Sequence, residues 1–161
     1  YNSVRVTEMS IEERVKALGI ELPESYGAIA NYIPVTRAGN ILYLAGTGPS
    51  SGASAIVRGK LGEGIGVEEG YRAARLAAIN ALAILHQELG SLDRVERILR
   101  MTGYINAAPD FEQHPAVLDG APDLLVEVFG ERGRHARAAV GVGSLPMRLS
   151  VEIELTVSVK G

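Results

Sequence analysis

A histidine and an arginine interrupt a run of small residues near the carboxyl end of the chain. Positions 133–146 read GRHARAAVGVGSLP, in which His135 and Arg137 lie two apart. In a strand they would share one face, with Ala136 and Ala138 on the other. A guanidinium can hold a carboxylate through two parallel hydrogen bonds, and the alanines would leave room for a small ligand. On the residues alone, a solvent-facing arginine is still the more economical interpretation.

The last predicted strand carries two acidic residues. Its sequence, VEIELTVSV at 151–159, alternates strictly, so that Glu152 and Glu154 lie on the polar side. A carboxylate beside an arginine on the same sheet could orient water and accept a proton from it. Both glutamates could equally be solvated surface groups, and the sequence leaves the two interpretations open.

Metal and nucleotide chemistry find little support in the sequence. His86, His114 and His135 are scattered without HExxH or H-x-H spacing, and the chain has no cysteine. GEGIGVEEG at 62–70 has neither the dinucleotide-binding spacing nor a phosphate-loop lysine, and it places glutamates where a phosphate would lie. We therefore expect no metal and no cofactor.

Composition limits the partners and the location. The 161 residues carry a net charge of −3 without a block of basic residues, which argues against nucleic acid as a partner. The longest nearly apolar run, 76–85, is shorter than the roughly 20 residues of a membrane span. Residues 1–20 are too acidic and polar for a signal peptide, so we expect a cytoplasmic protein without membrane contact.

These candidate residues must be positioned by helices and strands that the sequence also indicates. Helices are predicted over 10–18, where Ser10 and Glu13 form a capping box, over 67–89 and over 114–130. The predicted strands are 28–36, 41–45, 56–61, 93–106, 135–142 and 150–159. The pattern over 92–100 is also compatible with a helix.

This order of elements predicts an α+β fold. An antiparallel or mixed sheet would carry two long helices on one face, in a single domain over 1–161 with 1–26 as an extension of helix and connector. The strict alternation in the last strand gives the sheet a second, polar face, which must meet water or another subunit. We therefore expect the protein to self-associate through this sheet.

Two segments resemble a known family. ARAAVGVGSLP followed by VEIELTVSV is similar to the C-terminal signature of the YjgF/Rid family, the reactive-intermediate (enamine/imine) deaminases. NILYLAGTGP at 40–49 resembles the family's strand-S-G-Q-x-P segment. LGIELPE, VEEGYRAAR, LLVEVFG and GRHARAAVGV also resemble its longer, chorismate-mutase-like branch labelled endoribonuclease L-PSP, so the likeness covers nearly the whole chain.

The resemblance implies a chorismate-mutase-like fold, a homotrimer, and small-molecule sites between subunits that need no cofactor. By motif position, Arg137 would bind the carboxylate of a 2-imino acid and the backbone of Ala139 would contact its reacting end. Tyr32 would line the site and Glu152 would help to activate water. Hydrolysis would then give a 2-oxo acid and ammonia.

The chain departs from the family pattern within the implied site. Thr47 replaces a glutamine after the strand glycine Gly46, which itself would let a ligand approach the backbone closely. His135 stands in place of a proline, and Asp119 corresponds to an asparagine that lines the cleft. These changes leave the substrate open.

Three alternative functions remain. A non-catalytic binder of small carboxylates would keep Arg137 without needing Glu152. A ribonuclease would be expected to carry a basic surface, and a chorismate mutase would need several cations around a dicarboxylate. The resemblance favours imine hydrolysis with a small carboxylate substrate over these three.

Overall fold

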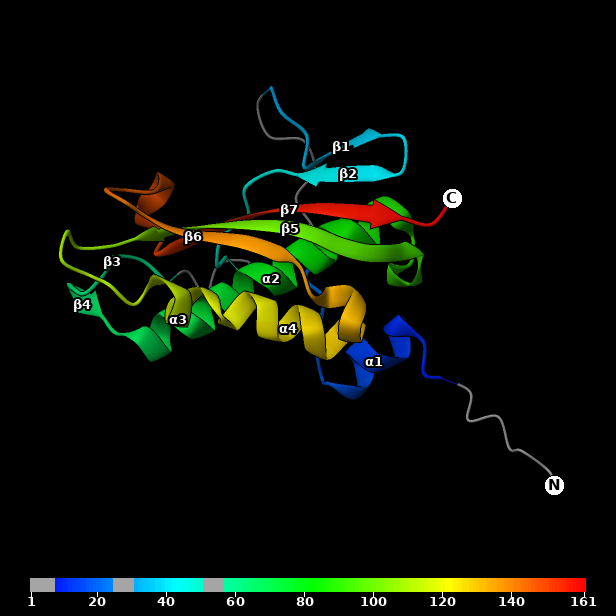
Figure 1. Ribbon diagram of the computed structural model, residues 1–161, viewed down its shortest axis with the longest axis horizontal. Coiled ribbons are helices and arrows are strands. Elements are labelled where there is room, and N and C mark those ends of the chain that lie inside the picture. Colours follow the sequence, from blue (N-terminus) through cyan, green and yellow to red (C-terminus); the bar gives the residue numbers. More distant parts are fainter. Residues whose placement is uncertain (1–7, 25–30, 51–56) are drawn as a thin grey trace.

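A mixed sheet of five strands forms the centre of the molecule. The computed structural model describes residues 8–24, 31–50 and 57–161. The strand order is β1-β2-β7-β5-β6, and the long helices α2 (Val67–Leu89) and α4 (Gly120–Phe129) cover one face (Figure 1). This arrangement confirms the predicted α+β fold.

Strands β5 (Val95–Asn106) and β7 (Val151–Val159) form the middle of the sheet and pair antiparallel. Strand β6 (Ala136–Val142) pairs parallel with β5 and forms one edge of the sheet. The alternation predicted for β7 is confirmed, because Val151, Ile153, Leu155, Val157 and Val159 are all buried in the core against the helices. Short 3₁₀ turns are η1 (Leu92–Arg94), η2 (Gly130–Gly133) and η3 (Pro146–Arg148).

The hairpin β1 (Val35–Ala38) and β2 (Ile41–Leu44) forms the other edge, and its first strand corrects a prediction. The strand expected over 28–36 begins only at Val35, and 28–30 lie outside the described residues. Pro34 precedes it and has no N–H to donate to a ladder, although its carbonyl accepts from the Ala45 N–H at 2.8 Å.

Two further predicted elements are divided. The strand expected over 56–61 is replaced, within the described residues, by the short pair β3 (Lys60–Leu61) and β4 (Gly64–Ile65). The helix expected over 114–130 is interrupted at Asp119, between α3 (His114–Leu118) and α4. Pro122 explains this interruption, since it cannot donate to the carbonyl four residues earlier.

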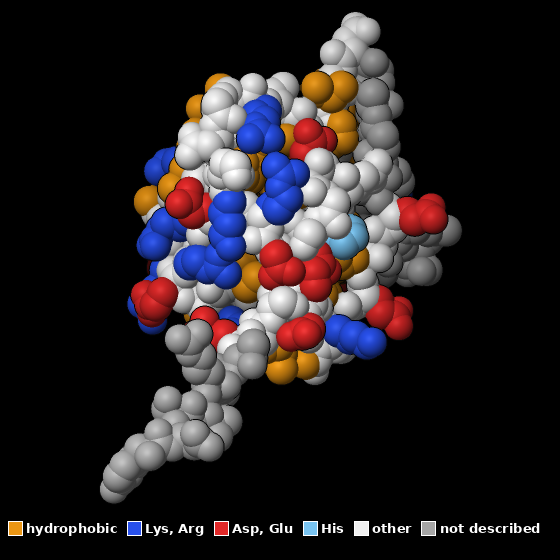
Figure 2. All heavy atoms as spheres, turned by 90° about the vertical axis from the view of Figure 1, so that its right-hand side faces the viewer, with side chains coloured by type: hydrophobic (Ala, Val, Ile, Leu, Met, Phe, Trp, Pro, Cys, Tyr) orange, Lys and Arg blue, Asp and Glu red, His pale blue; other side chains and the backbone are white. Residues whose placement is uncertain are grey.

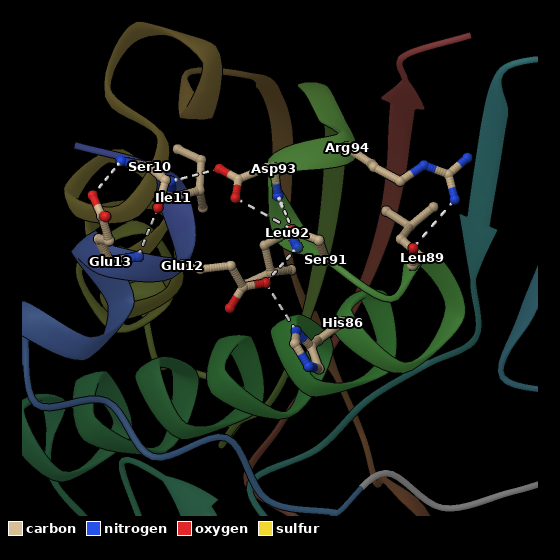
Figure 3. Close-up of polar contacts among 10 residues, drawn as sticks. All are labelled: Ser10, Ile11, Glu12, Glu13, His86, Leu89, Ser91, Leu92, Asp93 and Arg94. Carbon is tan, nitrogen blue, oxygen red and sulfur yellow. Dashed lines mark hydrogen bonds and ion pairs between the residues drawn. The ribbon is translucent and has the colours of Figure 1, made fainter. Parts of the chain in front are cut away.

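The N-terminal helix α1 (Ile11–Ala17) is held against the main body by backbone and side-chain bonds, and the predicted capping box between Ser10 and Glu13 is present. The Glu12 carboxylate accepts from the Leu92 N–H at 2.6 Å and lies 2.9 Å from His86 Nδ1, and Asp93 accepts from the Ile11 N–H at 2.7 Å (Figure 3). His86 of α2 therefore has a partner in α1. No described helix is long and apolar enough to cross a membrane.

Candidate active site

Arg137 lies on the edge strand β6 and meets the point where the α3–α4 segment is interrupted. Its Nη2 is 2.8 Å from Oδ1 of Asp119, and the two side chains are 26% and 48% exposed. Its Nη1 is buried and has no hydrogen-bond partner in the described part of the chain. The guanidinium thus makes one ion pair and keeps a second donor position uncommitted.

A cleft of about 590 Å³ surrounds this ion pair. Its lining comes from α4 and from the start of β6: Asp119, Pro122, Asp123, Val126, Glu127, Arg134, His135 and Arg137. Three of the predicted site residues, Asp119, His135 and Arg137, are therefore brought together on one side of the molecule.

His135 turns one ring nitrogen to the backbone and leaves the other without a partner. Nδ1 lies 2.6 Å from the carbonyl oxygen of Gly133, so that Nδ1 carries the proton and donates to that oxygen. Nε2 is buried and unpartnered within the described residues. Burial lowers the pKa of His135, and the nearby Arg137 charge lowers it further. The ring is therefore neutral at neutral pH.

Glu152 lies in a separate hollow of about 430 Å³ on the other side of the sheet. The hollow is lined by Tyr32, Ile33, Thr36, Tyr43, Leu44, Ala45, Gly46 and Glu152, which include three of the predicted site residues. Gly46 allows the close approach, since a Cβ at that position would lie 2.6 Å from Glu152 Oε1. Burial raises the pKa of Glu152, and the Glu154 charge raises it further.

The strand register places these two groups on opposite faces of the sheet. Arg137 pairs with Met101, which in turn pairs with the buried Leu155, so all three lie on the helix-covered face. Glu152 pairs with Tyr104, three residues after Met101 and therefore on the open face. Within one chain, the structure does not bring Arg137 and Glu152 together.

Two other predicted residues have structural roles in the chain. Thr47 is buried, donates its hydroxyl to the Ala45 carbonyl at 3.1 Å, and exchanges backbone hydrogen bonds with Ile153. Ala139 pairs with Gly103, shares the face of Arg137 and packs against the core. Their contacts with a ligand stay predictions.

Sequence reasoning missed two acidic residues in the Arg137 cleft. Asp123 and Glu127 follow Asp119 at intervals of four, the spacing that places side chains on one face of a helix. Both have partners on α2: the Tyr71 hydroxyl donates to Asp123 at 2.7 Å, and Arg75 Nη2 lies 3.1 Å from Glu127. Among the residues that the structure describes, no three acidic or histidine side chains are grouped closely enough to hold a metal ion.

Comparison with known proteins identifies relatives across nearly the whole chain. Residues 12–155 match the family model described as "YjgF/chorismate mutase-like, putative endoribonuclease". Protein TCP17 of Trypanosoma cruzi is 36% identical over 148 residues, which cover 91% of this chain and 92% of that protein.

Solved structures show the same relationship. The protein Atu1372 of Agrobacterium tumefaciens, whose function is described as unknown, is 41% identical with a TM-score of 0.87 and covers 93% of this chain and 92% of its own. A putative endoribonuclease of Shewanella oneidensis is 38% identical with a TM-score of 0.89 and covers 94% and 100%. RidA of an Antarctic Psychrobacter, 24% identical with a TM-score of 0.59 over 87% and 98%, shares the fold. The chain belongs to the YjgF/chorismate mutase-like family.

Proposed function

We propose that this protein hydrolyses reactive 2-imino and enamine acids to 2-oxo acids and ammonia, in a site formed between two subunits of a homotrimer. The arrangement of Arg137 and Glu152 supports a shared site. Each lies in its own hollow, on opposite faces of one sheet, so a second copy must bring its Glu152 face to the Arg137 cleft for the two to act on one ligand.

The observation that carries the chemistry is the placement of Glu152, whose carboxyl lies against Gly46 in a hollow that Tyr32 also lines. It is a half-buried carboxyl whose pKa is raised by desolvation, which makes the carboxylate a better proton acceptor than a solvated glutamate. The open face around it also offers Tyr32 to line the hollow. A glutamate that was merely a solvated surface group would not need this environment.

In the proposed reaction, the Arg137 guanidinium binds the substrate carboxylate from the cleft that it lines. Glu152 of the neighbouring subunit takes a proton from water as the water oxygen forms a bond to the imine carbon, and the C=N electron pair moves to nitrogen. The proton then passes to that nitrogen to give a carbinolamine. Glu152 next moves the hydroxyl proton to the same nitrogen, the C=O bond forms as the carbon–nitrogen bond breaks, and ammonia leaves with the 2-oxo acid as the other product. Every atom comes from the imine and one water molecule, so no cofactor enters.

The test is the decay of 2-iminopropanoate generated in place by an amino-acid oxidase acting on alanine. We expect the protein to accelerate this decay and Arg137→Ala to abolish the acceleration. The decay is measured as the release of pyruvate and ammonia while a trapping reagent competes for the remaining imine. No acceleration by the unmodified protein, or an unchanged rate in Arg137→Ala, would refute the deaminase proposal.

The second candidate function is non-catalytic binding of small carboxylates. Arg137, paired with Asp119, could bind such a ligand without Glu152. Glu152→Gln separates the two functions: a deaminase loses turnover and keeps ligand binding, whereas a binder shows no turnover to lose. A ribonuclease is less favoured. The net charge is −3, and the basic side chains grouped on the face in Figure 2 are bordered by acidic ones.

A further inference from the structure

The Arg137 cleft contains a carboxylate where a simple anion-binding site would contain none. Asp119 Oδ1 lies 2.8 Å from Arg137 Nη2, and nearly half of the Asp119 side-chain surface is exposed to the cleft or to solvent. A ligand carboxylate bound by Arg137 in the cleft would share the guanidinium with Asp119. Two carboxylates on one guanidinium repel each other unless a positive charge lies beside them.

The other charged groups of the cleft are already partnered. Asp123 accepts from the Tyr71 hydroxyl, Glu127 pairs with Arg75, and Arg134 pairs with Glu131 at 3.1 Å. His135 donates to the backbone and is neutral at neutral pH, because burial lowers its pKa. Asp123 keeps its negative charge, because a tyrosine hydroxyl is a neutral donor, but of these groups only Asp119 pairs directly with Arg137.

We propose that Asp119 makes the site selective for ligands that carry a cationic nitrogen next to their carboxylate, that is, an iminium or an ammonium. Arg137 would hold the carboxylate from the cleft while Asp119 pairs with the nitrogen, so the ion pair recognises both charges of a zwitterion. This inference rests on the proposed function for the position of the ligand, and it names the charge state of the substrate that the site selects. A ligand with two carboxylates, or with a neutral group in place of the nitrogen, would be disfavoured.

The probes are L-alanine and L-lactate, which differ in an ammonium against a hydroxyl on the same carbon. Their dissociation constants are measured by calorimetry on the full-length protein. We expect alanine to bind about tenfold more tightly than lactate, the usual worth of one charge-assisted hydrogen bond. Asp119→Asn should bring the ratio close to one, and Asp119→Glu, which keeps the charge, should retain part of the preference.

Asp123→Asn is the matched control, because it removes the same charge from the same helix face at a carboxylate held by Tyr71. We expect it to keep the preference for alanine. The proposal is overturned if the unmodified protein binds lactate as tightly as alanine or binds neither. It is equally overturned if Asp119→Asn leaves the ratio unchanged, or if Asp123→Asn lowers it as much. Failure of the proposed reaction is read separately, from imine decay, and does not alter these binding ratios.

Discussion

Gly46→Ala tests whether the position of Glu152 controls the reaction. Gly46 has an ordinary backbone conformation that alanine can adopt, so the substitution acts through its Cβ alone. That Cβ would lie 2.6 Å from Glu152 Oε1 and 2.9 Å from the carboxyl carbon. The carboxylate must move by at least about 0.8 Å before ordinary contact is restored, and it can move because it ends a flexible side chain.

A displacement of this size is large for catalysis and small for folding. A misplacement of about 1 Å at a reacting group can cost about 100-fold in rate. We therefore expect kcat for 2-iminopropanoate to fall by roughly one to two orders of magnitude. KM should change little, because Arg137 binds the substrate carboxylate at a different point. The free energy of unfolding should fall by less than about 1 kcal/mol, since the moving group is half-exposed.

Gly48→Ala is the matched steric control. Its Cβ would lie 2.6 Å from Leu149 Cδ1, the same overlap against an apolar side chain. We expect a stability loss of about 1 kcal/mol with kcat close to the unmodified value. If Gly46→Ala keeps full kcat while a crystal structure shows Glu152 displaced, the role given to Glu152 is refuted.

Three further predictions concern stability and pH. Glu12→Ala leaves the buried Leu92 N–H without its acceptor, so urea unfolding should show a loss of about 1–3 kcal/mol. Gly120→Ala should cost about 3 kcal/mol in the same assay, because its Cβ would lie 2.0 Å from the Tyr71 carbonyl oxygen, and backbone cannot move aside as a side chain can. Because the folded pKa of Glu152 is raised, the stability from this group is present below its unfolded value of 4.5 and is lost as pH rises through the folded pKa. Glu152→Gln should therefore raise the melting temperature at neutral pH, by at most about 2 °C for a half-exposed group, and the turnover of the unmodified protein should fall as pH drops through that raised pKa.

Local patterns were sufficient for much of the fold. The alternation in β7 identified its buried face, and the capping box at Ser10 marked the start of α1. Gly90 ends α2 in the left-handed conformation that a glycine at this position predicts. Two errors fell at prolines, since Pro34 delays the first strand and Pro122 interrupts the predicted helix after its first turn. The third, the strand expected over 56–61, fell in a glycine-rich segment that forms two short strands.

The site was harder to predict, because it depends on register and on contacts distant in sequence. The alternation of β6 and of β7 was correct for each strand, but only their shared pairing with β5 shows that Arg137 and Glu152 face opposite ways. The contact between Asp119 and Arg137 depends on where the α3–α4 segment lies against the sheet edge, which no local spacing reports. The departure from the family's asparagine pointed to Asp119 without showing its partner.

The most direct test of a site shared between subunits is complementation between two inactive variants. Arg137→Ala and Glu152→Gln are coexpressed with different tags, and assemblies that carry both tags are purified. In a closed trimer every such assembly has one site with both residues intact, so we predict about one third of the unmodified deaminase rate. A site within one chain would be broken in every subunit, and a doubly tagged assembly with no activity above that of either variant alone would contradict the account.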